Sequence, residues 1–447
     1  MKNQIITMKN FFFAFLFITS TVQAQQKIVG TLSPSEKQST ALLYRIVGAK
    51  QIYINNTNIE NGSFVFNLKN DEKVGVYRVA YDTKENSFVD FFYNKEDIIF
   101  QFDPKNAEDT KTFSISEENK LYSKFIQAVS YIQFEIDSLQ VNYLKNPDIK
   151  TAERYKTALG SINNVQKKYT EESQGKIVHE FIKATDRYNA PEIAKTPNEY
   201  LSGIKTHFFD NINFDNKIVF NSPFFVDRIS DYVFYINYSD DQKVQNVLYK
   251  ESTEKIIGKI DNPEFKKDVI EYLITQFMNL KNVDLVDFLF ENQYNSLPYN
   301  SQNLDFKKEV LASLTVEVGR TAPDFSWKEN GKTIKLSQLK DGENYILVFY
   351  STTCSHCTVE IPKLYEFLKD KPTTKVIAFA MEEDDSLWND FKSDLNGWHH
   401  ILGLNKWKNE TSKMYNIYST PTYFMLNEDK KIIAKPNHIE DLVALFK

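Results

Sequence analysis

Residues 345–368 read YILVFYSTTCSHCTVEIPKLYEFL, an apolar run followed by two cysteines and a helical pattern. The run from Tyr345 to Tyr350 is typical of a buried strand, and the residues from Thr358 to Lys369 have helical spacing. Cys354 therefore lies where a strand ends and a helix begins. Free backbone N–H groups and the helix dipole favour a negative charge there, which lowers the pKa of a thiol. Because the thiolate is the attacking species in thiol–disulfide exchange, we expect Cys354 to be reactive.

Cys357 follows one helical turn later and can attack a mixed disulfide formed at Cys354. A Cys-x-x-Cys pair can also be half of a zinc site, but the chain has only two cysteines, and His399 and His400 are adjacent rather than spaced as a ligand pair. A structural disulfide that closes so short a loop would stabilise little. We therefore expect a redox centre with no metal and no cofactor beyond the Cys354–Cys357 disulfide.

The residues that follow alternate between strand and helix signals. Further strands are expected at Val376–Met381, Thr422–Leu426 and Lys431–Ala434, and helices at Ser386–Leu395, Glu410–Tyr415 and Ile439–Phe446. Such alternation predicts an α/β sheet with helices on both faces.

The preceding sequence changes character twice. A β-rich pattern is interrupted by the turn dipeptide Asn61-Gly62, and a helical stripe begins near Leu121. The expected fold is multidomain, with a β-rich N-terminal domain, an all-α middle domain and a C-terminal α/β domain. The predicted boundaries are 1–24 for a signal peptide, 25–113 for the β-rich domain, 114–314 for the helical domain and 315–447 for the last domain.

The first residues carry an export pattern. Lys2 and Lys9 precede the apolar run from Phe11 to Ile18, and Val22-Gln23-Ala24 offers small residues for cleavage. No later segment is long and apolar enough to span a bilayer. The net charge of −6 and the absence of a basic cluster argue against a nucleic-acid partner. We expect a protein exported to the periplasm or cell envelope, without a membrane span in the mature chain.

Several short segments resemble one family. Val318 to Phe325, Leu336 to Leu339 and Phe349 to Ser351 lead into the cysteines in a way that is similar to the TlpA/ResA-like branch of the thioredoxin superfamily, which is related to the redoxins. The resemblance covers residues 315–447 and implies a thioredoxin-like fold and thiol–disulfide oxidoreductase activity. The β-rich region also resembles the N-terminal domains that precede thioredoxin domains in exported bacterial proteins.

Two prolines fit this resemblance. Pro362 lies where thioredoxin-like proteins kink the active-site helix. Pro421 matches the family's cis-proline, which faces the disulfide, so we expect a cis bond after Thr420. In the family the backbone of the preceding residue, here Thr420, pairs with an extended substrate chain.

Glu360 completes the motif Cys-x-x-Cys-x-x-Glu. In ResA-like proteins this glutamate is implicated in moving the proton of the buried cysteine, and a shielded carboxyl group suits that task. The alternative is an exposed first-turn glutamate that gains only from the helix dipole. Thioredoxin itself places an aspartate on the preceding strand, where this chain has Val348, which favours Glu360.

The sequence also departs from the family. Thr353 replaces the tryptophan that commonly precedes the first cysteine, and the nearest upstream aromatic residue is Tyr350. His356 resembles the Cys-x-His-Cys arrangement of DsbA and protein disulfide isomerase, where a histidine stabilises the thiolate and makes the disulfide more oxidising.

Two other chemistries, metal binding and peroxidase activity, are disfavoured by the sequence. The acidic run Glu382–Asp385 is expected to be a helix N-terminus favoured by the dipole, and not a metal site. A peroxiredoxin would need proline and threonine where this chain has Leu347 and Ser351, so peroxidase activity is disfavoured.

The sequence predicts an exported oxidoreductase that reduces disulfides of cell-envelope proteins and is itself restored by a membrane thiol-reducing donor. Its expected catalytic residues are Cys354, Cys357 and Glu360. Thr420 and Pro421 would bind substrate, and His356 would modulate the reaction. The alternatives are a partner-binding envelope protein with a subsidiary redox domain and a disulfide-forming oxidant.

Overall fold

The computed structural model describes residues 26–35, 38–82 and 84–446. The expected signal peptide, Met1 to Ala24, lies outside these residues. The chain divides into two compact units, Met1–Thr275 and Gln276–Lys447, and the division falls inside a helix of the expected middle domain. The domain boundaries at 113/114 and 314/315 stay a prediction. No helix in the described part of the chain is long and apolar enough to cross a membrane.

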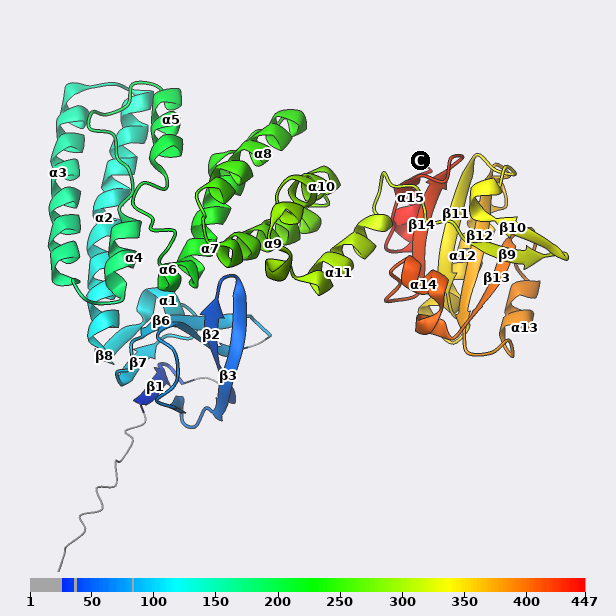
Figure 1. Cartoon of the computed structure of the whole chain (residues 1–447), viewed down its shortest axis with the longest axis horizontal. Helices are drawn as coiled ribbons and strands as arrows, with labels where there is room; N and C mark the ends of the chain where they lie inside the picture. The colour runs from blue at the N-terminus through cyan, green and yellow to red at the C-terminus, as the bar shows by residue number, and fades with distance from the viewer. Residues whose placement is uncertain (1–25, 36–37, 83, 447) are drawn as a thin grey trace, which may run out of the picture. The chain divides into compact units, whose positions relative to one another are not determined.

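The first unit begins with two four-stranded sheets, in the orders β4-β1-β7-β8 and β3-β2-β5-β6. Their strands are coloured blue to cyan in Figure 1. The strands are β1 (Gln26–Leu32), β2 (Thr40–Val47), β3 (Lys50–Asn58), β4 (Ser63–Leu68), β5 (Gly75–Asp82), β6 (Ser87–Tyr93), β7 (Ile98–Phe102) and β8 (Thr112–Ile115). Their apolar side chains form one core, in which the rings of Phe91 and Phe100 from the two sheets lie 5.5 Å apart. Asn61 and Gly62 both have positive φ, at 51° and 77°, as a tight turn requires.

Helices make up the rest of this unit. They are α1 (Ala107–Thr110), α2 (Glu117–Lys145), α3 (Ile149–Glu172), α4 (Val178–Thr185), α5 (Pro197–His207), α6 (Lys217–Phe220), α7 (Pro223–Ser230) with the π-helical η1 (Asp231–Ile236), α8 (Gln242–Gly258) and α9 (Pro263–Asn279), which contains the division between the units.

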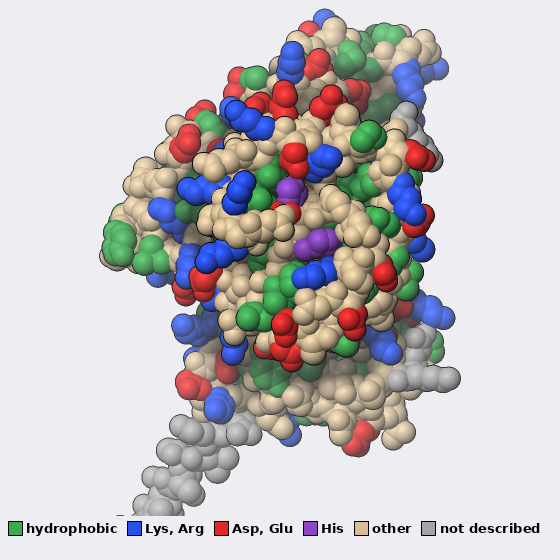
Figure 2. Space-filling view, turned by 90° about the vertical axis from the view of Figure 1, so that its right-hand side faces the viewer, with side chains coloured by type: hydrophobic (Ala, Val, Ile, Leu, Met, Phe, Trp, Pro, Cys, Tyr) green, Lys and Arg blue, Asp and Glu red, His purple; other side chains and the backbone are tan. Residues whose placement is uncertain are grey.

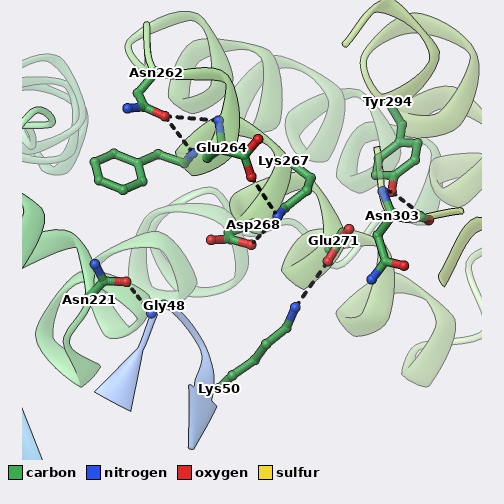
Figure 3. Close-up of polar contacts among 11 residues, drawn as sticks. Gly48, Lys50, Asn221, Asn262, Glu264, Lys267, Asp268, Glu271, Tyr294 and Asn303 are labelled. Atoms are coloured by element: carbon green, nitrogen blue, oxygen red, sulfur yellow. Dashed lines mark hydrogen bonds and ion pairs between the residues drawn. The ribbon is translucent and has the colours of Figure 1, made fainter. Parts of the chain in front are cut away.

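Polar contacts join the strands to the helices of the first unit. The buried amide of Asn119 on α2 accepts a hydrogen bond from the Phe92 N–H at 2.8 Å and donates one to the Phe92 carbonyl at 2.7 Å. At the β2–β3 turn, Asn221 accepts from the Gly48 N–H at 2.8 Å, and Lys50 pairs with Glu271 at 3.4 Å (Figure 3). Sheets and helices are therefore parts of one compact unit.

The second unit starts with the end of α9 and with α10 (Val283–Asn292), η2 (Tyr294–Ser296), η3 (Tyr299–Ser301) and α11 (Leu304–Thr315). Its α/β part contains β9 (Ser326–Glu329), β10 (Lys332–Lys335), η4 (Leu336–Gln338), β11 (Asn344–Tyr350), α12 (Ser355–Leu368), β12 (Thr374–Glu382), α13 (Trp388–Ser393), β13 (His399–Leu404), η5 (Lys406–Lys408), α14 (Glu410–Met414), β14 (Thr422–Asn427), β15 (Ile432–Ala434) and α15 (Ile439–Ala444).

A five-stranded sheet in the order β13-β12-β11-β14-β15 organises the α/β part. β11, β12 and β13 are parallel, whereas β14 and β15 are antiparallel to their neighbours. One core lies between the sheet and α12, α13 and α15, and a second core on the other face includes Phe325, Trp327 and Tyr415. The strands and helices expected from the sequence are present, whereas the β9–β10 hairpin and β13 are additional.

Charges are mixed on the surface. Figure 2 shows lysine and arginine side chains interspersed with aspartate and glutamate on the face that is turned toward the viewer. The described part of that face carries no continuous basic patch of the kind that nucleic acids require.

Asn119→Ala should destabilise the first unit by about 2 kcal/mol, because it leaves the buried N–H and C=O of Phe92 without partners. Denaturant unfolding of the full chain measures the effect, with the exposed Asn142→Ala on the same helix as control. Equal unfolding midpoints for the two variants would contradict the importance of this contact.

Candidate active site

The two cysteines lie at the junction between β11 and α12. β11 is almost wholly buried and delivers the chain to one edge of the sheet. Cys354 is the N-cap of the 14-residue helix α12, and its sulfur accepts a hydrogen bond from the Cys357 N–H at 3.4 Å. Both cysteines are free thiols, with Cys354 partly exposed and Cys357 fully buried. The helix terminus therefore supports negative charge at Cys354 alone.

The loop before β14 lies against the reactive sulfur. The Thr420–Pro421 peptide bond is cis, as the sequence predicts. The Cys354 thiol donates a hydrogen bond to the Thr420 carbonyl oxygen at 3.2 Å. The main chain just before Pro421 is thus brought to the sulfur atom that is expected to exchange.

The environments of the two thiols shift their pKa values in opposite directions. Burial alone would raise the pKa of Cys354, but hydrogen bonds from the side chains of Cys357 and Thr420 and from the backbone N–H groups of Cys357 and His356 outweigh it and lower that pKa. Burial raises the pKa of Cys357 to about 12, and its hydrogen bond with Cys354 adds to the rise. At neutral pH Cys354 is therefore the better nucleophile, and Cys357 keeps its proton.

His356 and Pro362 lie on the same helix. The His356 side chain is exposed, and its backbone N–H, rather than its imidazole, is among the main groups that lower the pKa of Cys354. Pro362 lies inside α12, at the position where the sequence predicts a kink. The described residues contain no group of three or more His, Cys, Asp or Glu side chains suited to hold a metal ion.

Glu360 lies one turn beyond Cys357 with only 12% of its side chain exposed. Its Oε2 accepts hydrogen bonds from the Tyr423 hydroxyl at 2.9 Å and from the Ile439 N–H at 3.1 Å. Nδ1 of His438 lies 3.7 Å from its Oε1. Glu360 is therefore a mostly buried carboxyl group with several partners, and not the exposed first-turn glutamate of the alternative.

The sequence places Glu382 at the start of a helix, and this prediction is wrong. Glu382 is the last residue of β12, is only 4% exposed, and α13 begins later, at Trp388. Its Oε1 accepts a hydrogen bond from the Thr352 N–H at 2.6 Å, and its Oε2 accepts one from the Ser351 hydroxyl at 3.3 Å. Hydrogen bonds stabilise the buried Glu382 carboxylate more than the dipole of a short helix would stabilise it at the helix N-terminus.

These contacts continue from the cysteine loop to the next strand. The hydroxyls of Ser351 and Thr353 lie 3.0 Å apart, and the Lys406 ammonium donates to Thr353 at 3.4 Å. Lys406 follows β13, whose carboxyl end meets those of β11 and β12 at one edge of the sheet. Sequence reasoning missed Glu382, Lys406, Tyr423 and His438, although a carboxylate at the end of a buried strand run was a usable signal for Glu382.

Comparison with known proteins shows which family the region around this site matches. Residues 317–442 match the Redoxin family. These residues form a redoxin domain. The thiol-disulfide oxidoreductase ResA of Bacillus thuringiensis is 29% identical over 124 residues, which cover 27% of this chain and 69% of the relative. The ResA protein of Bacillus cereus is 28% identical over 127 residues. The redoxin domain is a TlpA/ResA-like thiol–disulfide oxidoreductase domain with the thioredoxin fold.

Parts of this chain are also similar to solved structures. A thioredoxin-like protein from Bacteroides caccae has a TM-score of 0.39 and 17% identity, covering 59% of this chain and 98% of that protein. A domain of a possible thiol-disulfide isomerase from Cytophaga hutchinsonii has a TM-score of 0.26 and 29% identity, covering 29% of this chain and 90% of that domain.

Glu382→Ala should loosen the loop before Cys354, because the Thr352 N–H and Ser351 hydroxyl lose their acceptor. We expect a loss of about 1–3 kcal/mol in the free energy of unfolding of the redoxin domain. In a Cys357→Ser background, Cys354 should also be alkylated more slowly. The exposed neighbour Glu383→Ala is the control, and identical stability and alkylation rates in the two variants would refute the role of Glu382.

Proposed function

We propose that this protein is an exported oxidoreductase that reduces disulfides of other cell-envelope proteins through Cys354 and Cys357. The observation that carries the proposal is the opposite tuning of the two thiols, with the pKa of the partly exposed Cys354 lowered and that of the buried Cys357 raised to about 12. Such a pair provides one attacking thiolate and one protected thiol in reserve.

The reaction proceeds by two exchanges. The Cys354 thiolate attacks one sulfur of a substrate disulfide, forms a mixed disulfide and releases the first substrate thiolate. Cys357 then loses its proton and attacks the Cys354 sulfur, which releases the second substrate thiolate and leaves the Cys354–Cys357 disulfide. A membrane thiol donor returns two electrons and restores both thiols. The substrate chain would lie along the backbone at Thr420, beside Pro421 and the reactive sulfur.

The direction of electron flow depends on how strongly the protein stabilises the Cys354 thiolate, and therefore on the groups that lower the pKa of Cys354. The main contributors are neighbouring thiol, side-chain and backbone hydrogen-bond donors, not a cationic side chain. A strongly oxidising pair instead needs a strongly stabilised thiolate. A thiolate that is stabilised by hydrogen bonds without a cationic partner favours a reductant, and the exposed position of the His356 side chain agrees with this direction.

Export is supported by the pattern of residues 1–24, in which Lys2 and Lys9 precede an apolar run and small residues follow. A protein that is sent to the envelope meets substrates in which disulfides form and persist.

Cys357→Ser should trap substrates as mixed disulfides through Cys354, because the thiol that resolves them is missing. The measurement is the recovery of reductant-sensitive adducts after the full mature chain is incubated with a cell-envelope extract. The double variant Cys354→Ser, Cys357→Ser is the matched control. Adducts at the same level in both variants would contradict the proposal.

The reduction potential separates the two directions. A reductant should have a potential near that of thioredoxin, about −270 mV, whereas a disulfide-forming oxidant should lie near that of DsbA, about −120 mV. A reduction potential near that of DsbA would contradict the proposed reductase function and favour a disulfide-forming oxidant.

A further inference from the structure

The hydroxyl of Tyr423 is a polar group inside the core that shields Cys357. Tyr423 lies on β14 in register with Val348 of β11, and both side chains belong to the buried cluster that contains Cys357. The Val348 side chain has no polar atom, whereas the phenol of Tyr423 supplies a hydroxyl on the cysteine-bearing side of the sheet. That hydroxyl donates a hydrogen bond to Glu360 Oε2 at 2.9 Å.

Exposure increases along the groups that lead away from this core. Tyr423 is fully buried, the Glu360 side chain is 12% exposed, and the His438 side chain is 66% exposed. His438 Nδ1 lies 3.7 Å from Glu360 Oε1. The Tyr423 hydroxyl and the Ile439 N–H both bind the other carboxylate oxygen, Oε2. The three side chains therefore connect the interior to solvent.

We propose that Tyr423 and His438 complete a proton path that carries the thiol proton of Cys357 through Glu360 to solvent. The inference rests on the exchange reaction proposed above. In the resolving step, the Cys357 thiol approaches the hydroxyl of Tyr423, which lies in the same buried cluster, and passes its proton to the Tyr423 oxygen while the Tyr423 proton moves to Glu360. The Cys357 thiolate then attacks the Cys354 sulfur, the new disulfide forms, and the bound partner leaves as a thiolate. Glu360 passes the proton to the imidazole of His438, which releases it to water.

The environment of Cys357 explains why a path is needed. With a pKa of about 12, Cys357 is almost entirely protonated at neutral pH, so an internal base accelerates its attack. The pKa of Tyr423 is raised by burial, then by the charge and hydrogen bond of Glu360 and by the charge of Cys357, with Glu440 contributing less. Tyr423 therefore keeps a proton overall and serves as a relay, with Glu360 as the base.

Tyr423→Phe tests the path, because it removes only the hydroxyl. The reduced full mature chain is mixed with a bis(nitrobenzoate) disulfide whose thiolate is coloured. Attack by Cys354 releases the first thiolate, and resolution by Cys357 releases the second. We expect the first phase to be unchanged and the second to be slowed about tenfold or more. Tyr350→Phe is the matched control, because Tyr350 is another fully buried tyrosine of the same cluster.

The pH profile separates a relay from a packing effect. Without an internal base, the second phase should rise about tenfold per pH unit across neutral pH, since the thiolate fraction of a group with a pKa of about 12 grows at that rate. In the unsubstituted chain the rise should be shallower. The relay would be overturned if the second phase of Tyr423→Phe had the same rate and pH slope as that of the unsubstituted chain. It would also be overturned if Tyr350→Phe slowed the second phase as much as Tyr423→Phe does. A missing second phase in the unsubstituted chain would instead contradict the exchange reaction itself.

The outer end of the path is tested at His438. His438→Asn removes the imidazole and retains a side chain that caps α15 well. We expect repeated turnover to slow, and added imidazole buffer to restore it in this variant but not in Tyr423→Phe. Unchanged turnover, or slowing that imidazole does not relieve, would remove His438 from the path.

Discussion

Cys354 occupies the point where an almost wholly buried strand gives way to a helix, and the environment of both sulfur atoms follows from that position. β11 lies in the middle of the sheet and cannot shift without disturbing the cores on both of its faces. Its end therefore fixes where α12 starts. Helix geometry then places Cys357 one turn inside, where solvent does not reach, while Cys354 remains at the terminus with backbone donors directed at it.

Contacts from distant parts of the sequence hold this junction in place. Glu382 at the end of β12 accepts hydrogen bonds from the loop before Cys354, and Thr420 lies on the other side of the sulfur. Beneath the helix, Glu360 and Tyr423 provide hydrogen-bonded polar groups beside the apolar side chains of the core. The reactive thiol is thus stabilised at the surface of the domain, and the second thiol is kept protonated in its interior.

Local spacing was sufficient to predict part of this arrangement. The apolar run before Cys354, the interval to Cys357 and the position of Glu360 on the same helix all depend on neighbouring residues, so the sequence alone indicates them. Pro421 was recognised through its family resemblance, and its cis bond is present.

The remaining site residues depend on strand register. Glu382 and Lys406 reach the cysteine loop only because three parallel strands end at one edge, and Tyr423 faces Glu360 only because β14 pairs with β11 in one register. No periodicity in a single sequence encodes such pairings. β13 was missed for a related reason, since its opening residues His399 and His400 do not form an apolar run. The division of the chain inside α9 likewise has no signal in the sequence.

Titration of the two thiols in the reduced chain tests the central claim most directly. With isotope-labelled cysteines, NMR can follow Cys354 and Cys357 separately as the pH is raised. The account predicts that Cys354 titrates at a lower pH than an ordinary cysteine, and that Cys357 titrates near 12. Titration of both thiols together near the ordinary value, or of Cys357 before Cys354, would contradict it.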